Sequence, residues 1–283
     1  MKLSKLACAA AAAMALSFSS VAYTAPNFYV NTDVMASGDA NINGTDTDLK
    51  TSSFGVNVGN EYMTIGYMRT EYNFSGSFDP FDSLNKFTVD LRAERALSTS
   101  LVGYAGVTLG TLFEDDISLG DSYNISPRLA LGWTFMNGMT AYVGAYANLN
   151  AADNVFLPIV GLKIGEESDR GWSGSIAYPA TKVNYRFNKS WSADLTYLTI
   201  NDTYYMGDDV ARKGLLSEGF MREKSQGASI GVTWNTPLGL VLSGGLFTYF
   251  DREFKLYDKD GNDFATFETD NCAGAYLRGS LYF

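Results

Sequence analysis

The chain contains no histidine, and this limits the chemistry that its side chains can perform. Without an imidazole, neither a Ser-His-Asp nor a His-Asp arrangement can be built, and the commonest zinc ligand is missing. A carboxylate pair would have to supply all acid and base catalysis. No phosphate-binding pattern of the G-x-G-x-x-G or G-x-x-x-x-G-K-S/T type occurs. We therefore predict a protein that is not an enzyme and that holds no metal or cofactor.

Charged side chains at alternate positions are the remaining candidates for function. Within residues 86–94, charged residues alternate with Phe87, Val89, Leu91 and Ala93, and a period of two is typical of a β-strand. If the apolar face contacts lipid, the other face lines a lumen. The predicted lumen-facing charges are Lys86, Asp90, Arg92, Glu94, Arg128, Arg186, Asp194 and Arg278. The same reasoning places Arg69 and Glu71 inward, which leaves Tyr62, Met68, Tyr72 and Phe74 outward.

These charges have two interpretations. Basic and acidic side chains on opposite walls of a lumen could set a transverse field across a pore. Alternatively, they pair with one another and fill a barrel that is too narrow to conduct; for 12 to 14 strands both are physically possible.

Acidic segments are predicted to form exposed loops, at 114–116, 208–209 and 258–263. The segment 258–263 has Gly at its fourth position and no Glu at its twelfth, so its spacing does not fit a calcium-binding loop. We interpret it as a solvated turn. Divalent cations could still connect such acidic loops to the phosphates of lipopolysaccharide.

The elements that must position these residues are short alternating segments separated by turns, which is typical of an outer-membrane barrel. Two stretches, 129–152 and 225–250, carry no charge, but turn residues interrupt each of them, so each is predicted to be a hairpin. The predicted strands are 27–38, 48–58, 61–74, 85–96, 99–112, 123–136, 140–148, 154–165, 171–178, 181–188, 190–203, 222–234, 238–252 and 270–283.

The fold class predicted is all-β, a transmembrane up-and-down antiparallel β-barrel of about 14 strands. The hairpin 171–188 has short strands, so a barrel of 12 strands with this hairpin folded inward is the alternative. Short turns follow every second strand, and longer polar loops lie between them, at 76–84, 114–122, 207–221 and 256–269. Because short turns are periplasmic in this class, both termini are predicted to be periplasmic.

The first residues resemble an export signal. Lys2 and Lys5 precede an uncharged segment, 6–18, and Ser20-Val21-Ala22 offers small residues for cleavage after Ala22. The apolar segment is shorter than the roughly 20 residues that span a bilayer. We predict a cleaved signal peptide, 1–22, and a single barrel domain, 23–283. Only Cys272 then remains, so no intramolecular disulfide can form.

Composition and charge exclude other classes. The chain has 283 residues, of which 46% are hydrophobic, so it is not a disordered polymer. Its net charge of -10 would repel a phosphate backbone, which excludes a nucleic-acid partner.

The C-terminal strand carries an assembly signal. Leu277, Leu281 and Phe283 share one face, and a final strand of this kind resembles the signal that the barrel-assembly machinery of Gram-negative bacteria recognises. Aromatic residues near strand ends would form girdles at the membrane interfaces. They are Tyr62, Tyr72, Phe74, Trp133, Phe135, Trp191, Trp234 and Phe250.

Three segments carry a resemblance to a family, namely 156–162 (FLPIVGL), 172–179 (WSGSIAYP) and 182–188 (KVNYRFN), followed by Trp191. They resemble a family of uncharacterised outer-membrane β-barrel proteins, in which an L-P-I-x-G-L strand precedes a P-x-x-x-V-x-Y-R-[FL]-N segment. The detailed match covers about 40 residues. It implies a porin-like barrel and no assigned activity.

The function predicted from these features is a passive, porin-like channel for small polar solutes in the cell outer membrane. The alternative is a non-conducting structural or adhesion barrel that acts through its acidic extracellular loops. The predicted partners are outer-membrane lipid, lipopolysaccharide and, during biogenesis, the barrel-assembly machinery.

Overall fold

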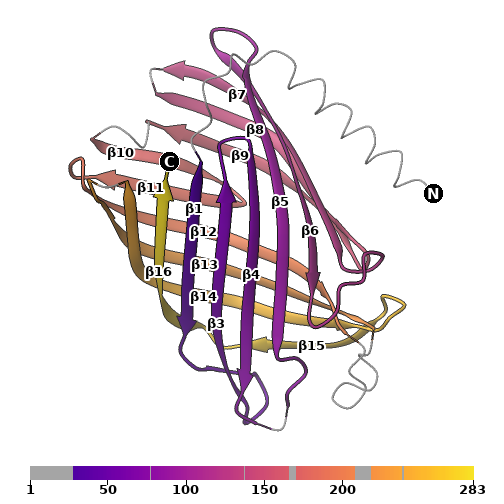
Figure 1. Cartoon of the computed structure of the whole chain (residues 1–283). Coiled ribbons are helices and arrows are strands. Elements are labelled where there is room, and N and C mark those ends of the chain that lie inside the picture. The colour runs from indigo at the N-terminus through magenta and orange to yellow at the C-terminus, as the bar shows by residue number, and fades with distance from the viewer. Residues whose placement is uncertain (1–27, 77, 137, 166–169, 208–217, 238) are drawn as a thin grey trace.

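The computed structural model describes residues 28–283 apart from 77, 137, 166–169, 208–217 and 238. The predicted signal peptide lies outside this range, as do the turn residues 137 and 166–169 and most of the loop 207–221. The described chain forms a closed antiparallel barrel whose wall has fourteen strands (Figure 1). They are β1 (Tyr29–Ser37), β3 (Asp48–Gly59), β4 (Met63–Phe74), β5 (Ser83–Ala96), β6 (Leu101–Phe113), β7 (Tyr123–Met136), β8 (Met139–Asn150), β9 (Asn154–Ile164), β10 (Gly171–Tyr178), β11 (Ala180–Arg186), β12 (Trp191–Tyr205), β13 (Phe220–Asn235), β14 (Leu240–Tyr257) and β16 (Cys272–Tyr282).

The predicted strands agree with these fourteen, and the alternative of twelve strands is wrong. The short strands β10 and β11 both lie in the wall, where β10 pairs with β9 and β11 pairs with β12. The barrel closes where the first strand, β1, pairs with the last, β16, in register from Tyr29↔Tyr282 to Ser37↔Gly274. We call this pairing the seam. Both ends of the barrel chain therefore lie at the same end of the barrel, which we call the termini end; the opposite end is the loop end (Figure 1).

Side-chain alternation explains why these residues form a barrel wall. On β7, Leu129, Leu131 and Trp133 point outward with 50–66% of their surface exposed. On the same strand Arg128 points inward, where its guanidinium reaches Asp90. A closed sheet pairs the backbone of every strand with two neighbours, so an apolar exterior and a polar interior are compatible with hydrocarbon outside.

The facing predicted for β4 is wrong. Met63, Ile65 and Tyr67 form its exposed apolar face, and Arg69 and Glu71 continue that outer face as an exposed ion pair, 47% and 57% accessible. The inward face carries Met68 and Tyr72, which line an internal cavity. The sequence pattern failed here because both faces of β4 contain bulky apolar residues.

Two short strands lie outside the wall order. β2 (Ala40–Asn41) pairs with β3, and β15 (Asp263–Thr269) pairs with the loop end of β14. The prediction of a polar loop at 256–269 is therefore wrong, because most of this segment is a hairpin whose turn spans 258–262 (Figure 1). No helix in the described part of the chain is long and apolar enough to cross a membrane.

A β-bulge changes the facing of β14. The β13–β14 ladder pairs Lys224 with Glu253 and next Gln226 with Phe250, so Ser225 lies opposite two residues. The first of these, Asp251, has a φ of 50°, in the left-handed region. The extra residue shifts the alternation by one position. Consequently Arg252, which alternation counted from Leu246 would place outward, is 3% exposed and turned inward.

The loop end of the barrel is narrowed because part of the wall is short. The β9–β10 ladder ends at Val160↔Tyr178, and the β11–β12 ladder ends at Ala180↔Leu198. Beyond Leu198, β12 no longer pairs with β11. The end of β12 lies beside β6 instead, where Tyr205 forms a bridge with Phe113. The Asn148 side chain of β8 also donates to the backbone oxygen of Asn201, at 2.9 Å. Strands from opposite walls thus meet.

Candidate functional site: the lumen and its closed loop end

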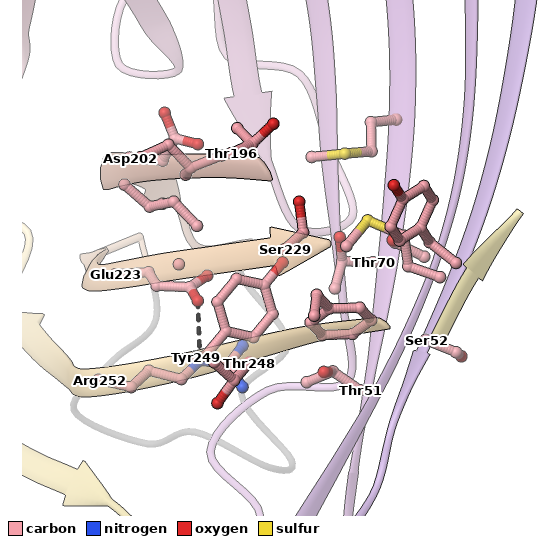
Figure 2. A pocket seen from close by; sticks show the side chains of 18 of the residues that line it. Thr51, Ser52, Thr70, Thr196, Asp202, Glu223, Ser229, Thr248, Tyr249 and Arg252 are labelled. Atoms are coloured by element: carbon pink, nitrogen blue, oxygen red, sulfur yellow. Dashed lines mark hydrogen bonds and ion pairs between the residues drawn. The ribbon is translucent and has the colours of Figure 1, made fainter. Parts of the chain in front are cut away.

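An internal cavity of about 350 Å³ lies between two walls of the barrel. Figure 2 shows Thr51 of β3 and Thr70 of β4 facing residues of β12, β13 and β14. Hydroxyl groups line much of the cavity, and the charged residues among its lining are Lys86, Asp194, Asp202, Glu223, Arg252 and Arg278. The lumen therefore offers polar contacts to a solute.

A buried hydrogen-bonded trio of Arg252, Glu223 and Tyr72 connects the two walls beside this cavity (Figure 2 marks the contact between Glu223 and Arg252). The Arg252 Nε donates to Glu223 Oε1 at 2.8 Å, and the Tyr72 hydroxyl donates to Glu223 Oε2 at 2.8 Å. The guanidinium lies over the rings of Tyr72, Tyr249 and Phe254. Removing one partner of a buried pair leaves a charge without compensation, so the trio holds β4 against β13 and β14.

Four of the predicted lumen-facing residues, Lys86, Asp90, Arg92 and Arg128, contact residues outside their own strand. Lys86 Nζ lies 2.7 Å from Asp202 Oδ2 on β12. Arg128 Nη2 lies 2.6 Å from Asp90 Oδ1, and the Thr108 hydroxyl donates to the same oxygen at 2.7 Å. Arg92 donates from Nε to the Glu61 carbonyl in the turn before β4.

The remaining predicted charges lie at different places in the barrel. Glu94 accepts from the Tyr104 hydroxyl at 3.3 Å. Arg186 Nε donates to the Asn188 carbonyl in the following turn. Asp194 and Arg278 line the cavity, and the Arg278 guanidinium lies 6.0 Å from the ring centroid of Tyr276. Whether these residues line a conducting path stays a prediction.

Sequence reasoning missed three residues that the structure places at the centre of this site. Asp202 lies on β12 in the same alternation as Asp194, so that pattern could have identified it. Glu223 lies on β13 at an alternate position that shares a face with Ser229. It is close to the start of the predicted strand, 222–234, where the pattern is short. Arg252 could not be placed, because the bulge at Asp251 reverses the facing and no sequence signal marks that bulge.

The loop end of the lumen is filled by an apolar cluster of buried side chains. It begins where the charges end: on β5 Leu84 precedes Lys86, and on β12 Tyr204 follows Asp202. Phe81, from the loop before β5, is fully buried at its centre, and Phe254 packs 5.7 Å away between ring centroids. The cluster consists of Ile42, Leu49, Tyr72, Phe81, Leu84, Leu112, Tyr204, Met206, Met221, Phe254 and Leu256.

The acidic turn at 258–262 is held by its own hydrogen bonds. The Asp258 carboxylate accepts from the backbone N–H groups of Asp260 and Asn262, at 2.9 and 2.8 Å, and from the Asn262 amide. The hydrogen bond from the Asn262 side chain lowers the pKa of Asp258. Among the described residues, no three acidic or cysteine side chains are grouped so that they could hold a metal ion.

Comparison with known proteins supplies no family for this chain. No protein-family model matches it, and no curated protein matches it. Among solved structures, it is similar to the NanC porin, with 9% identity over 89% of this chain and 99% of that chain and a TM-score of 0.37. The toluene transporter TodX of Pseudomonas putida shows 11% identity over 94% of this chain and 90% of that chain, with a TM-score of 0.33. OmpT of Vibrio cholerae shows 9% identity over 93% of this chain and 100% of that chain, with a TM-score of 0.35.

Proposed function

We propose that this protein is an outer-membrane barrel that does not conduct solutes in this conformation and that acts at the cell surface through its loop end. The observation that carries the proposal is the apolar cluster that fills the lumen at that end. Most of its side chains come from strands on opposite walls, and Ile42, Phe81 and Met206 come from the connections between strands. Opening would expose them to water, at a cost of about 25 cal/mol for each Å² of apolar surface.

The placement in the outer membrane rests on the outer surface. All four tryptophans are exposed and lie at the termini end of their strands, at positions 133, 172, 191 and 234. Trp191 and Trp234 stack on the outer wall with ring centroids 5.9 Å apart. Indole rings favour the boundary between hydrocarbon and water. We infer that these four tryptophans lie at the periplasmic interface of the membrane, and that lipid and lipopolysaccharide surround the barrel wall.

A gated channel is the second candidate, and the internal cavity favours it. The cavity is lined by hydroxyl and charged groups suited to a small polar solute. In such a channel the apolar cluster would be the gate, and the ion pair between Lys86 and Asp202 would border the path.

Planar-bilayer conductance of the purified barrel distinguishes a non-conducting barrel from a gated channel. We expect the wild type to give no steady conductance at moderate voltage. Phe81→Ser, which places a hydroxyl in the centre of the apolar cluster, should produce open events or a steady current. Phe156→Ser is the matched control, because Phe156 is 74% exposed on the outer wall and should leave conductance unchanged. A steady ion-selective current from the wild type would contradict the proposal and support the channel.

A further inference from the structure

Two of the six charged residues that line the luminal cavity have no counter-charge in the protein. The other four form the ion pairs Lys86–Asp202 and Arg252–Glu223. Asp194 on β12 and Arg278 on β16 also line the cavity, but among the described residues neither forms an ion pair or a side-chain hydrogen bond. A free carboxylate and a free guanidinium in one cavity attract groups of opposite charge.

The neighbours of Arg278 leave its guanidinium available. Asp33 on β1 lies opposite Arg278 in the seam, but its carboxylate turns toward β3. A Cβ added at Gly55 on that strand would lie 2.6 Å from Asp33 Oδ2 and 3.1 Å from Oδ1. On the other side of β16, Arg278 lies opposite Ser243, which carries no charge. Arg278 is exposed, so water in the lumen reaches it.

The Tyr276 ring lies along the wall between the two free charges. It crosses Gly245, where an added Cβ would lie 2.9 Å from the ring atom Cε1, and its hydroxyl reaches Gly231, where an added Cβ would collide with it. The same position at Gly231 is 3.3 Å from Asp194 Oδ1. The Arg278 guanidinium carbon lies 6.0 Å from the ring centroid. A carboxylate, an aromatic ring and a guanidinium therefore follow one another along this wall.

Beside these groups the middle of the cavity is uncharged. Thr196, the next inward residue of β12 after Asp194, pairs with Ser229 on β13. Figure 2 shows both residues on the same side of the cavity, with Thr70 on the opposite wall. Met68 of β4 also lines the cavity. This part suits a neutral group that offers hydrogen bonds and some apolar surface.

The arrangement of charges selects a small zwitterion. An anion alone would leave Asp194 without a partner and be repelled by it, and a cation alone would do the same at Arg278. A neutral molecule would compensate neither charge. A molecule with an ammonium and a carboxylate group satisfies both, because the ammonium donates to Asp194 beside the Tyr276 ring and the carboxylate accepts from Arg278. The cavity volume of about 350 Å³ restricts the molecule to a small one.

We propose that the luminal cavity binds an amino acid or a short peptide in its zwitterionic form, with Asp194 at the ammonium and Arg278 at the carboxylate. Because the apolar cluster fills the loop end of the lumen, the ligand enters from the termini end. The inference goes beyond the proposed function, since the cavity lies on the other side of the cluster from the cell surface. Free amino acids and peptides present the same two charged termini, and the test distinguishes them.

The test is isothermal titration calorimetry at neutral pH on the purified full barrel in octyl glucoside, an uncharged detergent. The probes are the common amino acids, dialanine and trialanine, each titrated separately. The probe that binds most tightly is then compared with its N-acetyl derivative, which lacks the ammonium, and with its amide, which lacks the carboxylate. We expect each blocked form to bind about tenfold more weakly or worse. The tightest probe identifies the source, either a free amino acid or a peptide.

Two variants assign the site. Asp194→Asn should weaken binding of the zwitterion about tenfold and abolish the preference for it over its N-acetyl derivative. Arg278→Gln should do the same for the amide derivative. Neither side chain has a polar partner in the described protein, so both variants should keep the thermal unfolding midpoint of the wild type.

The matched controls are Asp260→Asn in the turn 258–262 and Arg69→Gln on the outer face of β4, which remove the same charges outside the lumen and should leave binding unchanged. The proposal is overturned if no probe binds, if a blocked form binds as tightly as its parent, or if either luminal variant binds like the wild type. Because conductance is measured separately, a failure here is distinguishable from a failure of the proposed function.

Discussion

At the scale of single residues, Arg252 is the clearest case of a side chain that depends on its surroundings. It is buried, paired with Glu223 and covered by aromatic rings. We expect Arg252→Gln to lower the free energy of unfolding by about 3–5 kcal/mol, because Glu223 then keeps a buried charge with only Tyr72 as a donor. The measurement is a urea titration of the barrel in lipid vesicles.

The double variant Arg252→Met with Glu223→Leu should recover most of this loss, since apolar residues of similar volume replace a buried pair at little cost. Lys50→Met is the control, because the ion pair of Lys50 with Asp39 is exposed on both sides, at 58% and 56%. That change should alter stability by less than about 1 kcal/mol. If Arg252→Gln is as mild as Lys50→Met, the trio does not hold the walls together.

At the scale of the elements, each strand carries one face for lipid and one for the lumen. Leu131 lies on the outer face of β7 and is 50% exposed. We expect Leu131→Arg to reduce assembly strongly, because an Arg facing hydrocarbon near the bilayer midplane costs roughly 2–4 kcal/mol. Thr196→Arg introduces the same side chain into the luminal cavity and should assemble nearly as well as the wild type. The readout is heat-modifiable gel mobility of membrane fractions; equal loss in both variants would refute the assigned facing.

At the scale of the whole molecule, stability depends on closing the seam between β1 and β16. The last bond of that seam runs from the Phe283 backbone N–H to the Phe28 carbonyl, at 2.9 Å. We expect deletion of Phe283 to slow insertion several-fold while export across the inner membrane continues, since an open edge leaves backbone groups that hydrocarbon cannot satisfy. Phe283→Tyr keeps an aromatic ring and should insert normally. Pulse-chase appearance of the folded form measures this, and wild-type rates from the deletion would exclude the assembly role.

The barrel could be predicted from the sequence, because each strand needs only a period of two and a turn, and both are local properties. The sequence therefore predicted fourteen strands, and the charges on β5 and β7 that pair in the lumen were recognisable from alternation alone. Tertiary structure alone decided that the loop end is closed. The bulge that turns Arg252 inward, the shortness of β10 and β11 that lets β12 reach β6, and the meeting of Tyr72 with Glu223 all join residues distant in the chain. Contacts across a lumen depend on how the sheet closes, and a periodic pattern within one strand carries no information about its partner on the opposite wall.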